Sequence, residues 1–207
     1  VMSHTGTPGA QHYSDEELRA IVDEAHRRGL RVATHTHGAD AVRAAVAAGI
    51  DCIEHGFLVD DDAIDKMVAA GTYLVPTTRL ADAMDVSHAP PDLQAKAAEM
   101  FPKARTSVKA AYDAGVKIAL GTDAPAIPHG KNADELVALV DRGMSELAAL
   151  RAATIVAAEL IDVDDRGRLA EGLLADIIGV PGDPLQDITV TQDVRFVMKG
   201  GKIHVGN

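Results

Sequence analysis

"RVATHTHGAD", residues 31–40, is the stretch that decides the fold. A short run containing Val32 ends in His35 and His37, and a glycine and a helical pattern follow at once. This order predicts a strand that passes directly into a helix over residues 39–49. Side chains alternate faces along a strand, so both imidazoles are expected to point the same way.

The same strand and helix unit repeats on both sides of this stretch. Upstream, Ser14 and Glu17 stand in capping-box spacing at the start of a helix that ends at Gly29. The pattern predicts strands over residues 30–35, 50–55, 72–78 and 116–123. It predicts further helices over residues 39–49, 60–71, 91–115 with a break near Pro102, 132–142 and 145–160.

Strands that alternate with long helical patterns indicate βαβ crossovers and a parallel sheet, so the predicted fold class is α/β. In the barrel form of this architecture, chemistry is located at the C-terminal ends of the strands. After residue 162 the chain becomes rich in glycine and short β-type runs, and KGGK at 199–202 favours a hairpin. We therefore predict two segments, residues 1–161 and a β segment over 162–207.

Composition narrows the classes of partner. The 207 residues carry a formal net charge of −11, which repels a phosphate backbone or an anionic membrane. The sequence has no run of about eighteen apolar residues, so we expect neither nucleic acid nor a membrane as partner. The single cysteine, Cys52, cannot form an internal disulfide. This fits a reducing compartment such as the cytoplasm, and a signal peptide would lie upstream of Val1.

Side chains suited to metal or acid–base chemistry stand at the predicted strand ends. His35 and His37 end one strand, His55 ends the next, and Asp123 ends the last. Neighbouring parallel strands lie about 4.8 Å apart, so side chains at their ends can surround one ion. Alone, each histidine is compatible with a solvated strand terminus, and Asp123 with a cap or turn residue. Jointly they favour a metal site, with Asp123 able to move a proton.

Three further residues are candidates for substrate binding. His129 lies in the loop after Asp123, where a histidine is more often merely solvated. Thr78 and Arg79 end the predicted strand over 72–78 and could hold a substrate carboxylate. The alternative for Arg79 is a salt bridge in the helix layer.

The other acidic and histidine residues are given less weight. Strand alternation places Glu54 opposite His55, so we expect Glu54 beneath the helix layer as a structural partner. His4 has the same status as a loop histidine. We expect the remaining histidines at the surface, namely His12, His26, His88 and His204.

An ordered set of motifs connects the chain to a known family. These are THTHG at 34–38, IEHG at 53–56, LVPTT at 74–78, GTDA at 121–124, PHG with Asn at 128–132, and the tail over 175–203. With His55 placed 20 positions after His35, they resemble the C-terminal half of the amidohydrolase superfamily. They most resemble its imidazolonepropionase-like branch, with Xaa-Pro dipeptidases, zinc carboxypeptidase-like enzymes and ochratoxin-hydrolysing amidohydrolases. The resemblance covers essentially the whole chain.

The resemblance implies half of a (β/α)8 TIM-type barrel, the equivalents of strands five to eight, with a C-terminal piece of a small β-sandwich. It places His35 and His55 as metal ligands of the fifth and sixth strands. Asp123 matches the metal-binding acid/base residue of the eighth strand. His37 falls where relatives contact substrate or polarise the scissile carbonyl.

The activity that the resemblance implies is metal-dependent hydrolysis of an amide by an activated hydroxide, with one or two divalent metals, most plausibly zinc. The implied substrates are dipeptides, N-acyl amino acids or ochratoxin-like amides. Relatives in this branch are often oligomers, so we expect a homo-oligomer. The family's first-strand histidine pair, its carboxylated lysine and the first half of its β-sandwich would lie upstream of Val1. We therefore expect a fragment whose partner is the missing N-terminal half.

Three alternatives stay open at this point. In one, the HTH of residues 35–37 is the first-strand histidine pair, which the order of the later motifs argues against. In another, the protein is a mononuclear deaminase or cyclic-amide hydrolase, although Gly38 stands where those relatives usually carry glutamate. In the third, the chain is a non-catalytic half-barrel that needs a complementary chain.

Overall fold

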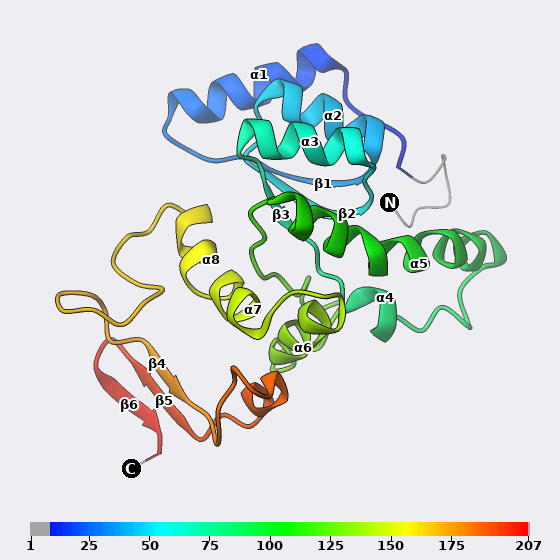
Figure 1. Cartoon of the computed structure of the whole chain (residues 1–207). Helices are drawn as coiled ribbons and strands as arrows, with labels where there is room; N and C mark the ends of the chain where they lie inside the picture. Colours follow the sequence, from blue (N-terminus) through cyan, green and yellow to red (C-terminus); the bar gives the residue numbers. More distant parts are fainter. Residues whose placement is uncertain (1–8, 207) are drawn as a thin grey trace. The chain divides into compact units, whose positions relative to one another are not determined.

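The computed structural model describes residues 9–206, which divide into two compact units at Ile118 and Ala119 (Figure 1). The first unit contains α1 (Asp15–Arg27), β1 (Ala33–Gly38), α2 (Ala39–Ala48), β2 (Cys52–Leu58), α3 (Asp61–Ala70), β3 (Tyr73–Val75), α4 (Leu80–Ala83) and α5 (Pro91–Ala114). The second contains α6 (Ala133–Asp141), α7 (Glu146–Ala152), α8 (Ile155–Leu160), β4 (Ile177–Gly179), the 3-10 helix η1 (Ile188–Gln192), β5 (Phe196–Lys199) and β6 (Lys202–Val205). The boundary predicted between residues 161 and 162 stays a prediction.

The first unit is built on a parallel sheet with the order β1-β2-β3. This confirms the α/β class and the parallel pairing. The predicted strand over 116–123 is wrong, because only one parallel bridge forms there, between Leu74 and Ile118. Further along, the amide of Leu120 donates to the carbonyl of Ala152 at 3.0 Å, so the backbone has left the ladder.

One face of this sheet is closed by helices. Ile53 and Leu74 share a face by register and are completely buried. On the other face, the paired His35 and Glu54 keep part of their surface exposed. Figure 1 shows α2 and α3 side by side above β1 and β2. The helix layer therefore covers the Ile53 face. The opposite face is more open around His35 and Glu54, whereas Cys52, Tyr73 and Val75 on that face are buried.

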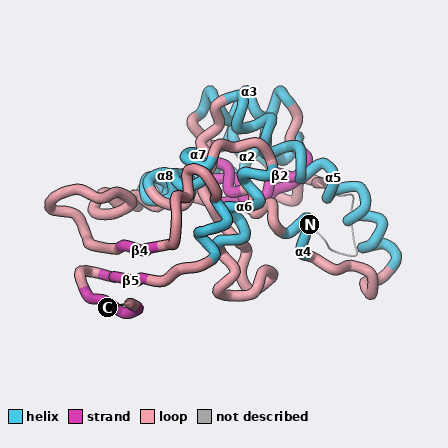
Figure 2. The backbone as a smooth tube through the Cα atoms, turned by 60° about the horizontal axis from the view of Figure 1, so that its bottom comes forward, coloured by secondary structure: helices cyan, strands magenta, loops and turns pink. Residues whose placement is uncertain are grey.

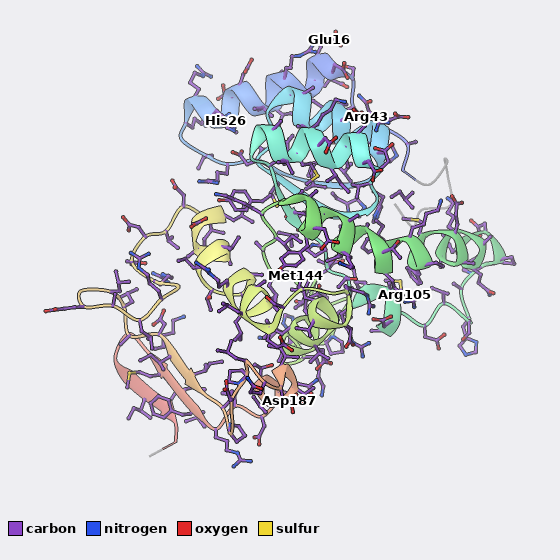
Figure 3. All side chains as sticks on the ribbon, viewed as in Figure 1. Glu16, His26, Arg43, Arg105, Met144 and Asp187 are labelled. Atoms are coloured by element: carbon purple, nitrogen blue, oxygen red, sulfur yellow. The ribbon has the colours of Figure 1, made fainter. Side chains whose placement is uncertain are left out.

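Local signals define the helix ends in this unit. Ser14 and Glu17 form the predicted capping box of α1. The layer is also tied together by charge, because Arg43 of α2 pairs with Asp40 and donates to Asp60, the N-cap of α3, at 2.7 Å (Figure 3). The hydrogen bond from the Ala63 amide and the contact with Arg43 hold the pKa of Asp60 below its usual value.

Two helix predictions are corrected by the structure. No break occurs near Pro102, because α5 runs without interruption from Pro91 to Ala114. Pro102 is on the exposed side, where a carbonyl that loses its helical partner can meet water. The helix predicted over 145–160 is two helices, because Thr154 departs from helical geometry at φ −126° and ψ −90°.

The second unit ends in an antiparallel sheet with the order β4-β5-β6 (Figure 2). The predicted KGGK hairpin is confirmed, since Lys199 pairs with Lys202 across Gly200 and Gly201. Both glycines have positive φ, which the two-residue turn requires. Within residues 9–206, no helix combines the length and apolar character of a membrane span.

Truncation of Leu74, the middle residue of β3, should strongly lower the stability of the first unit. Leu74 is completely buried, so Leu74→Ala is expected to lower the free energy of unfolding by about 2–5 kcal/mol. Urea unfolding followed by circular dichroism measures this loss. The matched control is Leu30→Ala at a 59% exposed position, with an expected change within about 0.5 kcal/mol. Equal losses in both variants would contradict the placement of Leu74 in the core.

Candidate functional site at the strand ends

Three imidazole rings gather toward the C-terminal ends of β1 and β2. Both strands run three residues further than predicted, to Gly38 and Leu58, so His35 and His55 lie within them. The ring centroid of His35 lies 4.8 Å from that of His37 and 4.5 Å from that of His55. His37 and His55 stack at 5.1 Å with an interplanar angle of 27°. His35 and His37 thus lie on one side of β1, as strand alternation predicts. The structure brings these three predicted site residues together.

His55 reaches this cluster because its backbone leaves the extended conformation. The register pairs His55 with Thr36, so a regular strand would turn its ring away from His35. At His55 φ is +72°, in the left-handed region, and the ring joins the other two. Gly56 follows at φ +61°, and a Cβ there would lie 2.8 Å from Cδ1 of Leu74. Glycine at this position suits the left-handed conformation, and a Cβ there would require the Leu74 side chain to shift.

Thr77 also belongs to the cluster. Its Oγ1 lies 2.6 Å from Nδ1 of His55 and donates to the carbonyl of Pro76 at 2.8 Å. Thr77 is buried and has φ +46°, a strained conformation for a β-branched residue. Sequence reasoning placed Thr77 at a strand end but gave a binding role to its neighbours instead. The available signal was a hydroxyl directly after a proline that follows a strand.

His37 is the most deeply perturbed group of the cluster. It is 5% exposed, and among the described residues its Nδ1 has no hydrogen-bond partner. Burial lowers the pKa of His37 to about 2, with further lowering by the charges of His55 and His35. His37 is therefore a neutral imidazole near neutral pH, able to present a ring nitrogen to a ligand.

Glu54 does not lie where alternation predicted. It pairs in register with His35, which places it on the more open face and not beneath the helices. Its Oε1 accepts a hydrogen bond from Sγ of Cys52 at 3.2 Å. The prediction failed because it measured alternation from His55, whose left-handed backbone reverses the direction of its side chain.

The two other candidates near β3 have contacts typical of structural residues. Thr78 is completely buried, and its hydroxyl donates to the carbonyl of Ala104 in α5 at 3.4 Å. A guanidinium nitrogen of Arg79 lies 3.9 Å from a carboxylate oxygen of Asp82 in α4. The salt bridge that sequence analysis left open for Arg79 is thus present. Substrate binding by these residues stays a prediction.

The remaining candidates lie in the second unit or outside the described residues. Asp123 is exposed at φ +54°, and its carbonyl accepts from the amide of Ala126 at 2.8 Å, so it opens a turn. His129 is exposed in the following loop. His4 lies outside the described residues. The histidines predicted at the surface are all exposed, namely His12, His26, His88 and His204.

The donor set fits part of a metal site. His35 and His55 present imidazoles from adjacent strands, and imidazole is a common ligand for zinc and other transition metals. In residues 9–206, no group of three or more histidine, cysteine, aspartate or glutamate side chains is arranged to hold a metal ion. The described residues therefore provide fewer ligands than the three or four of a typical zinc site.

Comparison with known proteins identifies the family. The model of the Amidohydrolase family matches residues 1–204. The chain belongs to the amidohydrolase family. Members of this family generally bind metal ions.

Similar proteins agree with this membership. Ochratoxinase from Aspergillus niger is 36% identical to this amidohydrolase chain over 215 residues, covering 100% of the chain and 44% of the relative. A Xaa-Pro dipeptidase with methionine bound in its active site has a TM-score of 0.92 at 37% identity, covering 99% of the chain and 52% of that structure. A prolidase complexed with N-methylphosphonate-L-proline has a TM-score of 0.87 at 36% identity, covering 95% and 50%. The chain spans about half the length of these relatives.

The buried thiol of this amidohydrolase chain should resist alkylation. Burial, then the charge of Glu54 and the hydrogen bond to it, raise the pKa of Cys52 far above its usual value. Because the thiolate is the reactive form, iodoacetamide is expected to label the folded chain slowly even at alkaline pH. Mass spectrometry measures the labelling rate, and the urea-unfolded chain is the fast-reacting control. Equally fast labelling of both would contradict a buried, protonated Cys52.

Proposed function

We propose that the chain supplies part of the active site of a metal-dependent hydrolase that cleaves amide or peptide bonds. The single observation that carries this proposal is the convergence of His35 and His55, with ring centroids 4.5 Å apart, toward the C-terminal ends of adjacent parallel strands. These are the positions where α/β enzymes with parallel strands place their chemistry. Membership of the amidohydrolase family supports the reaction class.

His35 and His55 would hold a divalent metal, with zinc as the candidate. When bound, such a metal lowers the pKa of a coordinated water and polarises a carbonyl. His37 lies beside the two ligands and is neutral, so it would hydrogen-bond the carbonyl oxygen as charge develops there. Asp123 would accept a proton from the attacking water and pass it to the departing amine. The role of Asp123 rests on its place in the GTDA motif at 121–124.

The proposed substrates are dipeptides with a C-terminal proline or another residue, N-acyl amino acids, or ochratoxin-like amides. This range is supported by the similarity of the chain to a Xaa-Pro dipeptidase, a prolidase and an ochratoxinase. The deaminase alternative is less well supported by the structure. A Cβ at Gly38 would lie 2.1 Å from the carbonyl oxygen of Gly9, so the glutamate typical of those relatives has no room there.

We further propose that the catalytic unit is a (β/α)8 barrel to which this chain contributes four strand positions. Three are the parallel strands β1 to β3, and the fourth is the bridge at Ile118. Since the chain spans about half of its relatives, the other metal ligands would come from the part of the barrel that the relatives' remaining length represents.

Loss of either imidazole ligand should weaken metal binding. His35→Asn and His55→Asn are each expected to reduce Zn²⁺ affinity by at least about tenfold, because each removes a direct donor. Competition with a chromophoric zinc chelator measures the change. The matched control is His88→Asn, which removes an exposed histidine and should leave the affinity unchanged. If His35→Asn and His55→Asn bind zinc as tightly as the control His88→Asn, the proposed ligands are refuted.

Asp123→Asn should abolish turnover while leaving the fold intact, because it removes the proton-accepting carboxylate but keeps its size. Hydrolysis of Xaa-Pro dipeptides and N-acyl amino acids by the zinc-loaded protein gives the rate. The assay is run on this chain alone and after addition of a polypeptide that matches the rest of the relatives' length. A matched control is Asp141→Asn, at the end of α6. Retained turnover in Asp123→Asn would refute the assigned role.

A further inference from the structure

We propose that Thr77 is a positioning residue that holds His55 as the tautomer protonated on Nδ1. The inference rests on the proposed function in one respect, which is that His55 is taken as a metal ligand. Thr77 itself is not one of the proposed metal ligands, and the sequence alone did not indicate a role for it. The single hydroxyl of Thr77 takes part in two hydrogen bonds, one with Pro76 and one with His55.

The hydroxyl of Thr77 has one proton and two contacts. Oγ1 lies 2.8 Å from the carbonyl oxygen of Pro76 and 2.6 Å from Nδ1 of His55. The carbonyl oxygen can only accept, so the hydroxyl proton is directed to Pro76. Oγ1 must then accept from His55, which places a proton on Nδ1.

The opposite assignment is unfavourable in a buried site. If the hydroxyl donated to Nδ1, its oxygen lone pairs would face the carbonyl oxygen of Pro76 at 2.8 Å. Pro76 is fully buried, so its carbonyl would also lose this partner. Thr77 is 2% and His55 6% exposed, which limits compensation by water. One assignment satisfies both contacts and the other satisfies one, so the Nδ1-protonated tautomer is preferred.

The backbone fixes the hydroxyl in this bridging position. β3 ends at Val75, and Pro76 follows without an amide proton. Thr77 then adopts φ +46°, which turns its side chain back toward the preceding carbonyl and toward the end of β2. A β-branched residue has few χ1 rotamers, so the hydroxyl is held in place before any ligand binds.

The consequence concerns the other ring nitrogen of His55. With a proton on Nδ1, Nε2 carries the lone pair, which is the form a metal requires. A ligand histidine whose second nitrogen donates to a fixed acceptor is held in both tautomer and ring orientation. Residues that directly follow β3 would thereby orient a metal ligand carried by the neighbouring strand β2.

The tautomer can be measured directly in the 207-residue chain without metal. Long-range ¹H–¹⁵N correlation spectra are recorded in EDTA, at a pH well above the ordinary histidine pKa of about 6.5. Loss of signals in His55→Asn assigns the ring of His55. The expected pattern is a proton on Nδ1 and a lone pair on Nε2. The reverse pattern would overturn the proposal without any variant of Thr77.

Three variants then test the source of the preference. Thr77→Val keeps the shape but removes the hydroxyl, and it should shift His55 toward the Nε2-protonated form and lower Zn²⁺ affinity about 10–100-fold. Thr77→Ser keeps the hydroxyl and should preserve both properties. The matched control is Thr72→Val, because Thr72 is also buried and its hydroxyl also donates to a carbonyl, that of Ile50 at 3.2 Å. It should lose similar stability but keep the wild-type tautomer and zinc affinity.

The outcomes separate this proposal from the proposed function. If Thr77→Val leaves the tautomer of His55 unchanged, Thr77 does not position the ring, even where zinc binding depends on His55. If the tautomer shifts as expected but zinc affinity is insensitive to His55→Asn, the positioning role stands and the metal site is wrong. Should Thr77→Val fail to fold by circular dichroism, the wild-type tautomer and its retention in Thr77→Ser decide the question.

Discussion

Backbone hydrogen bonds join β1 to β2 in parallel register from Ala33↔Cys52 to Thr36↔His55, and they determine where the functional groups lie. Parallel strands need a crossover, which α2 provides between them. The register sets the ends of both strands at one edge of the sheet, with Ile53 and Leu74 fixing the covered face. Any slip by one residue would move the histidines to the opposite face.

Much of this arrangement could be predicted from the sequence, because it follows from periodic side-chain placement. Alternation put His35 and His37 on one side, and helical periodicity with Ser14 and Glu17 located α1. Alternation then failed at His55, because the prediction assumed an extended backbone where φ is +72°. Glycine is the residue that usually adopts a positive φ. A histidine at position 55 therefore does not indicate from the sequence that the backbone is left-handed there.

Two other failures arise from contacts between segments that are distant in the sequence or lie on different strands. Residues 116–123 have β-type composition, yet the Leu120 amide finds the Ala152 carbonyl and the strand is reduced to one bridge. Thr77 was overlooked because its role depends on contacts with Pro76 and His55 that join two strands. Contacts between different segments depend on the fold as a whole, so they cannot be predicted from the composition of one segment.

The close approach of Gly9 and Gly38 has a consequence for how the sequence can vary. A Cβ on Gly9 would lie 2.6 Å from Cα of Gly38, and one on Gly38 would lie 2.1 Å from the Gly9 carbonyl oxygen. The N-cap position of α2 thus has room only for hydrogen atoms where the segment before α1 crosses it. Each glycine is compulsory because of the other, so replacing one alone, or both together, would need the two backbones to separate. This steric pairing links two positions that are far apart in the chain, and helix propensity at position 38 would not reveal it.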